Sequence, residues 1–183
     1  MKFHVKQAVA VVAAVMCTLA FSPMAQAQGS SAGPTDPQIA EIVVVANQID
    51  IAYGKLALKT SKDKEVRSFA EQMVRDHSAQ LKAVTALATK LHVTPAASDT
   101  SKSLETQSKE TTAKLKALKG TAFDKAYVDN EVAYHTAVIN AVTTVLIPNA
   151  KNAELKGALE AAGPLFQGHL AHAKNIQASL NKN

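Results

Sequence analysis

Cysteine, tryptophan and aromatic side chains are scarce in this sequence of 183 residues. Its one cysteine, Cys17, lies near the start of the chain, so no disulfide can form within the chain and packing alone must hold the fold. No other thiolate is available for nucleophilic catalysis or for binding soft metals. Aromatic residues make up only 4% of the chain, which leaves little to stack on nucleic-acid bases. Nucleic-acid binding is therefore not expected.

Catalytic and nucleotide-binding motifs are also missing. The sequence has no Gly-rich phosphate loop, no Gly-x-Ser-x-Gly and no His-Glu-x-x-His. A ferritin-type di-iron centre needs a Glu-x-x-His motif on each of two helices. Here Glu131 precedes His135 by four residues and Glu71 precedes His77 by six, so that motif does not occur. Ferroxidase chemistry of this kind is not expected, and because no nucleophile–base pair is visible, the sequence does not predict an enzyme.

Only one long hydrophobic run is found, and it lies at the N-terminus. Lys2 and Lys6 precede an apolar run of about 14 residues, 8–21, which is followed by an Ala-Gln-Ala tripeptide that ends at Ala27. The run is too short for a membrane-spanning helix and is typical of a secretory signal peptide. We expect residues 1–27 to be cleaved after Ala27 and the protein to be periplasmic. No other run reaches 18 residues, so we expect no transmembrane segment in the mature chain.

The charge of the chain is only mildly basic. Twenty Lys and Arg residues stand against 15 Asp and Glu, and removing Lys2 and Lys6 leaves 18 against 15. The basic residues are dispersed among the acidic ones, which is typical of a solvated surface. Homo-oligomerisation and peripheral association with the cell envelope are both compatible with such a surface.

Four segments have apolar residues at alternating spacings of three and four, the pattern of amphipathic helices. Asp36 and Pro37 predict the first start, with Asp36 as the N-cap and Pro37 at the first helical position. Ser61 or Asp63 can cap the second helix. The third follows Gly120 with a Thr-x-x-Asp start at Thr121, and Asn152 can cap the fourth. We therefore expect a flexible segment at 28–35 and one domain at 36–183.

The connection between the second and third helices is long and polar. Residues 96–120 contain only three leucines, which predicts a loose crossover with a short helix. The helices on either side are joined by short turns into two hairpins. This layout predicts an all-α, antiparallel four-helix bundle. A crossover that spans the bundle makes the topology ferritin-like, whereas one that folds back makes it up-and-down; we favour the ferritin-like form.

Each predicted helix carries one polar residue on its apolar stripe. These residues are Asp50, His77, His135 and His169. Counted from the helix ends at about 1.5 Å per residue, both pairs lie near the middle of the bundle. Imidazoles and a carboxylate are good ligands for zinc, iron, copper or manganese. The four residues are therefore candidate ligands of one transition-metal ion.

Three further residues could support this site. Asp76, next to His77, points about 100° around the helix and could orient a ligand rather than bind the ion. Glu131 lies one turn before His135 and could be a ligand or orient that histidine, and Tyr127 can donate a hydrogen bond into the same interior. In the alternative interpretation no metal binds, the polar residues only set the register of the helices, and the bundle has a structural or stress-related binding role.

Three segments resemble a bacterial exported family of unknown function. They are "GKLALKTSKDKEVRSFAEQMVRDHSAQ" (54–80), "FDKAYVDNEVAYHTAV" (123–138) and "PLFQGHLAHA" (164–173), and the resemblance extends over about residues 38–180. Members of the family are often labelled as outer-membrane or membrane proteins, and the resemblance implies a ferritin-like fold and export. It implies no established activity.

The resemblance also matches individual residues. The pattern of the family includes Asp-His in the second helix, Phe-Asp, Tyr and His in the third, and Pro with a His five residues on in the fourth. Where the family usually has Glu before the Gly-Lys-Leu-Ala stretch, this chain has the shorter Asp50. The matching residues here are Asp76, His77, Phe123, Asp124, Tyr127, His135, Pro164 and His169.

Overall fold

The structure is a computed structural model that describes residues 33–182. The predicted signal peptide, 1–27, and most of the predicted flexible segment, 28–35, lie outside the described residues. Between residues 33 and 182 no helix combines the length and the apolar character needed to cross a membrane. In chain order the elements are α1 (Asp36–Thr60), α2 (Lys64–Lys90), α3 (Asp99–Lys116), α4 (Gly120–Ala141), the π-helical turn η1 (Val142–Leu146), α5 (Ile147–Asn149) and α6 (Ala153–Leu180).

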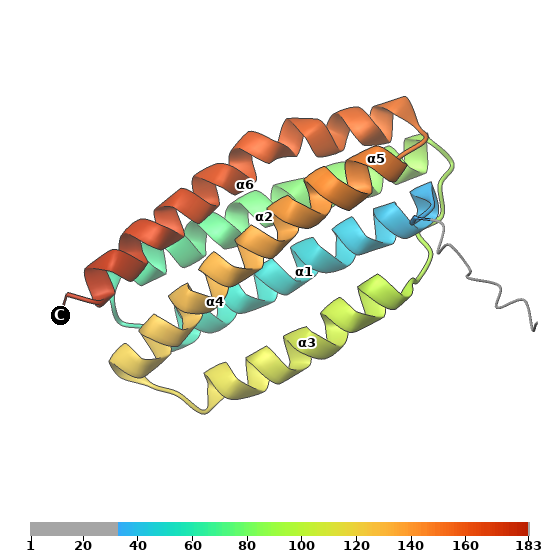
Figure 1. Cartoon of the computed structure of the whole chain (residues 1–183). Coiled ribbons are helices and arrows are strands. Elements are labelled where there is room, and N and C mark those ends of the chain that lie inside the picture. Colours follow the sequence, from blue (N-terminus) through green and yellow to red (C-terminus); the bar gives the residue numbers. More distant parts are fainter. Residues whose placement is uncertain (1–32, 183) are drawn as a thin grey trace, which may run out of the picture. The chain divides into compact units, whose positions relative to one another are not determined.

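The long helices α1, α2, α4 and α6 form the bundle (Figure 1). α1 and α2 make one antiparallel hairpin, and α4 and α6 make the other. α2 ends at the opposite end of the bundle from the start of α4, so these two helices run in the same direction (Figure 1). The connection between the hairpins therefore spans the bundle, and the predicted ferritin-like topology with one long crossover is confirmed.

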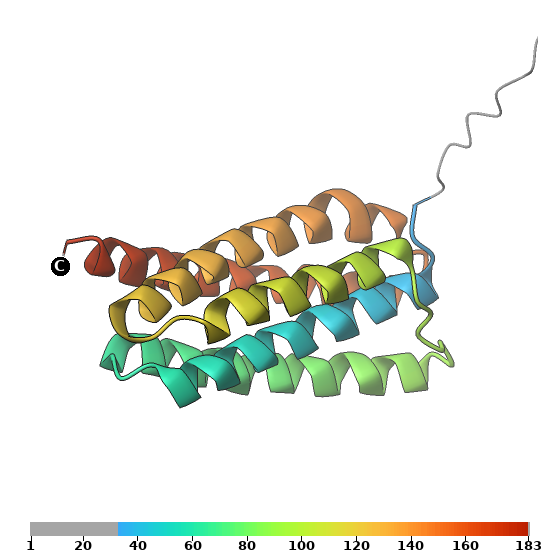
Figure 2. The same cartoon turned by 90° about the horizontal axis from the view of Figure 1, so that it is seen from below.

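The crossover is more regular than the sequence predicts. It contains α3, a helix of 18 residues that packs along α1 and touches α4 (Figure 2). Leu115 is 2% exposed and belongs to the core, and the half-buried Leu104 packs against it. Two leucines on one face are enough to hold a helix whose other faces are solvated. The polar composition of this segment therefore led us to expect a loose connection where a regular helix forms.

The prediction that Asp36 caps α1 is wrong by one residue. Thr35 occupies the cap position, and its backbone N–H donates to Gln38 Oε1 (2.9 Å). The carboxylate of Asp36 instead accepts hydrogen bonds from the backbone N–H groups of Lys151 and Asn152 (2.8 and 2.9 Å). Asp36 therefore ties the start of α1 to the turn before α6.

Two of the other predicted helix starts are confirmed and one is wrong. Asp63 caps α2 and Asn152 caps α6, each accepting from two backbone N–H groups of the first turn. α4 begins at Gly120, so Thr121 lies inside the first turn and does not cap it.

Near its C-terminal end α4 widens into the π-helical turn η1, because a proline follows. Pro148 has no N–H to donate, and its ring would clash with the carbonyl of Thr144 in a regular α-helix. The N–H of Ile147 donates to the carbonyl of Val142, five residues earlier. Such π turns are frequent at functional sites.

The core divides into two regions along the bundle. One, which we call the packed half, is built around large side chains that are completely buried. Phe69, Phe123 and Tyr127 are each 0% exposed, and Gly54 lets α1 approach α2 closely, since a Cβ there would lie 2.8 Å from Val74. Its buried members are Val45, Ile49, Tyr53, Ala57, Val66, Phe69, Ala70, Met73, Leu115, Phe123, Tyr127, Val128, Ala173 and Ile176.

The other region, which we call the cavity half, is mainly aliphatic and less tightly closed. Ala162 and Phe166 remain 8% and 7% exposed there. Its buried members are Ile39, Ile42, Val142, Leu146, Ala150, Leu155, Leu159, Ala162 and Phe166.

Candidate metal centre

Polar side chains meet in the interior of the bundle, between the packed half and the cavity half. The four predicted ligands, Asp50, His77, His135 and His169, come from α1, α2, α4 and α6 and are at most 3% exposed. Glu131, one turn before His135, is 0% exposed. We call these five residues the polar layer.

Asn47 orients the ring of His77. Its Oδ1 lies 2.9 Å from His77 Nδ1, and its Nδ2 donates to the carbonyl of Val43 (2.8 Å). Because the contact with Val43 sets the amide orientation, Asn47 presents an acceptor and His77 Nδ1 must donate. The lone pair of the neutral ring is then on Nε2. This atom lies 3.3 Å from Asp50 Oδ2 and forms no hydrogen bond.

His135 and His169 are held in the same manner by different acceptors. His135 Nδ1 lies 3.1 Å from the backbone carbonyl of Glu131, and His169 Nε2 lies 3.0 Å from Asp76 Oδ2. Each of these nitrogens therefore donates, and the lone pair of the neutral ring falls on the other nitrogen. Those nitrogens, His135 Nε2 and His169 Nδ1, have no hydrogen-bond partner.

The three imidazoles are neighbours in space. The ring centroids of His77, His135 and His169 are 5.2 to 5.6 Å apart. Each ring offers one nitrogen that lies within 4.8 Å of those of the other two. The three rings thus share one small buried volume, and each has one nitrogen without a hydrogen-bond partner.

Burial keeps two of the imidazoles neutral. Desolvation, together with the nearby His169, lowers the pKa of His77 to about 4. Desolvation also lowers the pKa of His135, although the Asp50 carboxylate opposes this effect. Both rings are therefore unprotonated on their free nitrogen near neutral pH and can donate a lone pair.

Two carboxyl groups complete the polar layer. Asp50, Glu131 and His135 each offer one atom within 4.8 Å of the other two. Burial raises the pKa of Asp50, while the imidazole of His135 opposes the rise. Burial raises the pKa of Glu131 well above its usual range, and the adjacent Asp50 raises it further. Asp50 Oδ1 and both oxygens of Glu131 lack hydrogen-bond partners, so this site favours an added proton or cation.

The other predicted supporting residues lie beside the layer. Partial burial alone would raise the pKa of Asp76, but hydrogen bonds from His169 and Arg75 outweigh it and leave that pKa below its usual value. Asp76 is therefore a carboxylate that accepts from His169. Tyr127 has its hydroxyl buried without a partner, and burial with the nearby Glu131 raises its pKa well above the usual value.

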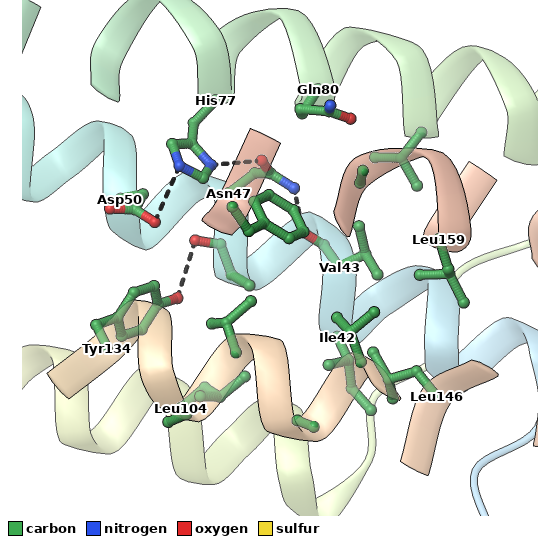
Figure 3. Close-up of a pocket in the computed structure, with 18 of the residues that line it drawn as sticks. Ile42, Val43, Asn47, Asp50, His77, Gln80, Leu104, Tyr134, Leu146 and Leu159 are labelled. Carbon is green, nitrogen blue, oxygen red and sulfur yellow. Dashed lines mark hydrogen bonds and ion pairs between the residues drawn. The ribbon is translucent and has the colours of Figure 1, made fainter. Parts of the chain in front are cut away.

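A cavity of about 640 Å³ begins at the polar layer and extends through the cavity half (Figure 3). Asp50 and His77 lie at its polar end, and Leu146 and Leu159 line its apolar part. The same cavity is lined by Thr100, Leu104 and Gln107 of α3.

Asn47 is the residue that the sequence analysis missed. It is 3% exposed and accepts the hydrogen bond of His77. It lies three residues before Asp50, so helical spacing places the two on one face. That spacing was the available signal, but it does not identify which histidine on another helix is within reach.

The profile of the family "Domain of unknown function (DUF4142)" matches residues 20–176. No curated protein sequence matches the chain.

Two solved structures are similar in fold. One is a DUF305 protein from Streptomyces coelicolor, assigned as a secreted protein, with a TM-score of 0.66 and 12% identity over 79% of this chain and 92% of that one. The other is CopM in its Cu(II)-bound form, with a TM-score of 0.63 and 14% identity over 80% of this chain and 98% of that one. At these identities the likeness establishes the helical fold alone. Together with the match over residues 20–176, it confirms the predicted kind of family: the chain belongs to the DUF4142 family of unknown function.

Proposed function

We propose that this protein binds one divalent transition-metal ion in the polar layer. His77, His135 and His169 are its nitrogen ligands and Asp50 its carboxylate ligand. The observation that carries the proposal is the pairing of each ring: one nitrogen donates to a fixed acceptor, and the other has a buried, unpartnered lone pair. Histidines that bind metals are typically held in this way.

The three acceptors are of the kinds that orient metal-binding histidines. Asn47 contributes an amide oxygen, Glu131 a backbone carbonyl and Asp76 a carboxylate. Each sets the tautomer of one ring before any ion binds. In this proposal Asp76 orients a ligand, and the ring that it orients is His169 and not the adjacent His77.

Charge balance supports the same proposal. Asp50 and Glu131 are buried beside one another, and their raised pKa values reflect the cost of two charges in that place. A divalent cation between the carboxylates and the imidazoles neutralises both charges. It also supplies a partner for the unpartnered oxygens.

The ligand set favours some metals over others. Three imidazoles with one carboxylate suit Zn(II), Cu(II) and Ni(II) better than Mn(II), whose preferred ligands are oxygens. The copper in the similar structure is a property of CopM; here the preference follows from the ligands. An ion can reach Asp50 and His77 through the cavity, which gives the site an entry path.

In the alternative function no metal binds, the carboxyl groups of Asp50 and Glu131 are protonated, and the polar layer only sets the register of the helices. The raised pKa values of Asp50 and Glu131 favour this form when no cation is present. A neutral carboxyl could then donate to one of the free imidazole nitrogens. The two functions differ in what occupies the space between the rings, so a metal titration separates them.

The test is calorimetric titration of the EDTA-treated protein with Zn(II), Cu(II) and Mn(II), with bound metal measured by mass spectrometry. We expect one ion per chain and weaker binding of Mn(II). His135→Ala removes one ligand without touching the cavity and should weaken Zn(II) binding at least ~100-fold, above the range for losing an orienting group.

His172→Ala is the matched control. His172 lies three residues after His169 on α6, but its Nδ1 pairs with Gln72 Oε1 (2.9 Å) and it is not part of the polar layer. This variant should bind Zn(II) like the wild type. Equal Zn(II) binding by the two variants, or none by the wild type, would contradict a metal site in the polar layer.

We also propose that the protein acts after export, with residues 1–27 removed as a signal peptide. The basic start, the apolar run and the tripeptide ending at Ala27 support this. N-terminal sequencing of protein purified from the periplasm should begin at Gln28. A mature protein that begins at Met1 would contradict export by this route.

A further inference from the structure

The cavity is large enough for an organic ligand. Its volume of about 640 Å³ lies within the range of roughly 300–1,000 Å³ typical of small-molecule sites. Most of its wall is aliphatic, and Val145, the one large apolar side chain of the described residues that is strongly exposed (40%), belongs to that wall. Figure 3 shows Ile42, Val43, Leu104, Leu146 and Leu159 around it. An apolar site of this size that water can enter favours a hydrocarbon guest.

Small side chains are the reason that this space stays open. Alanines from four helices line it where larger residues would fill the gap between α1, α2, α4 and α6. The π-helical turn η1 contributes Val142, Val145 and Leu146 to the same wall. The lining alanines are Ala46, Ala83, Ala133, Ala137, Ala141, Ala158 and Ala162.

One end of the cavity is polar and has unpartnered hydrogen-bonding atoms. Asp50, 2% exposed, leaves its Oδ1 without a partner, and Asn130 leaves its Nδ2 without one. Both residues line the cavity. One is an acceptor and the other a donor, so a ligand group that both donates and accepts satisfies the two. Of the other polar groups at this end, Asn47 donates to the carbonyl of Val43 and Tyr134 to that of Ala46. His77 Nε2 has no hydrogen-bond partner and lies 3.3 Å from Asp50 Oδ2.

The charge of the lining excludes an anionic head group. Among the residues around the cavity there is no Lys or Arg, and the only titratable acid and base are Asp50 and His77 apart from two tyrosines. A carboxylate or phosphate placed there would be desolvated without a counter-charge. An uncharged hydroxyl or amide meets no such penalty.

We propose that the cavity binds an uncharged amphiphile: a hydrocarbon body with one hydroxyl or amide group at its end. The body lies among Ile42, Val142, Leu146 and Leu159, and the polar group lies between Asp50 and Asn130. Asp50 and His77 also belong to the proposed metal site, so the binding experiment uses the metal-free protein.

The experiment uses the EDTA-treated full chain and the neutral fluorescent probe N-phenyl-1-naphthylamine. We expect saturable probe binding at one site per chain. Decanol should displace the probe, whereas decanoate should need at least ~10-fold higher concentrations, because its carboxylate would be buried beside Asp50 without a counter-charge. Equal displacement by decanoate would overturn the assignment of an uncharged head group.

Filling the cavity gives the second arm. Ala137→Leu with Ala158→Leu adds two side chains at lining positions that are exposed and so have room for them. This pair should weaken decanol binding at least ~10-fold. The matched control, Ala161→Leu, lies on α6 outside the lining and should bind like the wild type. Undiminished decanol binding by the filled variant would overturn the cavity as the site.

A third variant tests the head group and guards against misfolding of the filled protein. Asn130→Leu keeps the side-chain volume but removes the donor, so decanol binding should fall several-fold while probe binding stays unchanged. Undiminished decanol binding in Asn130→Leu would contradict the proposal, and because the protein is metal-free this result does not depend on whether a metal binds.

Discussion

The packed half and the cavity half lie along the same bundle but differ in the size of their side chains. In the packed half, Phe69, Phe123 and Tyr127 fill the space between helices completely. In the cavity half, alanines such as Ala137 and Ala158 face a space of about 640 Å³. Since tight packing supplies much of the stability of a core, the packed half must do most of the stabilising. The other half is free to accept a ligand.

The polar layer lies at the boundary between the two. On one side its residues are backed by well-packed side chains, which holds the rings in place. On the other side Asp50 and His77 reach the cavity, which gives access from outside. A rigid wall on one side and an opening on the other are what a binding site in a bundle needs.

The largest expected difference between the halves concerns two isoleucines on α1. Ile49 and Ile42 are similarly buried, at 6% and 5%, but belong to the packed half and the cavity half respectively. We expect Ile49→Ala to lower the free energy of unfolding by about 4 kcal/mol and Ile42→Ala to lower it by about 2 kcal/mol. The loss is smaller for Ile42 because a side chain that borders an existing cavity makes fewer packing contacts to lose. Urea denaturation measures both, and equal losses would contradict the division into halves.

The next effect is the pH dependence of stability at the boundary. The pKa of His77 falls from 6.5 to about 4 on folding, so the unfolded chain binds more protons between these values. His77 therefore contributes stability above pH 6.5 that is lost as the pH falls to 4, about 3 kcal/mol at ~1.36 kcal/mol per pKa unit.

Comparison with His77→Gln isolates this contribution. Asp50 and Glu131 have raised pKa values and act in the opposite direction, since their contribution to stability decreases as the pH rises. They are present in both proteins and cancel to first order. The difference in unfolding free energy between the metal-free proteins should change by about 3 kcal/mol between pH 6.5 and 4. A constant difference would show that His77 titrates normally.

A smaller effect concerns the orientation of His169. If a metal binds as proposed, Asp76→Asn removes the carboxylate that accepts from His169 and should weaken Zn(II) binding by ~10–100-fold, or about 1.4–2.7 kcal/mol. Asp129→Asn is the control, because Asp129 accepts from Gln177 (2.7 Å) away from the polar layer. Calorimetric titration that gave the same affinity for both variants would exclude an orienting role for Asp76.

The smallest expected effect reverses sign between the halves. A Cβ at Gly54 would lie 2.8 Å from Val74 and 3.0 Å from the carbonyl of Ala70, whereas one at Gly157 would meet nothing within 4 Å. Gly54→Ala should therefore destabilise the protein by about 1–2 kcal/mol through overpacking. Gly157→Ala should stabilise α6 by up to ~1 kcal/mol through helix propensity. Thermal unfolding of the two variants tests this. An unfolding temperature of Gly54→Ala at or above that of the wild type would mean that α1 and α2 can separate at little cost.

The sequence predicted the four bundle helices and one polar residue on the stripe of each, because helical periodicity is a local property. It underestimated α3, whose polar residues resemble those of a loop until α1 offers its two leucines a surface. It also misplaced the cap of α1, since Asp36 bonds instead to a turn more than a hundred residues away. Each error involves a contact that no local pattern encodes.

Taken alone, the sequence determined which residues could meet: Asp50, His77, His135 and His169, each on the apolar stripe of its own helix. Only the tertiary structure decided how they meet. The rotation and spacing of the helices determine that Asn47 accepts from His77 and Asp76 from His169, and thereby which nitrogen of each ring stays free. They also leave the cavity, because the distance between helices depends on side chains from four helices at once and cannot be read from any one of them.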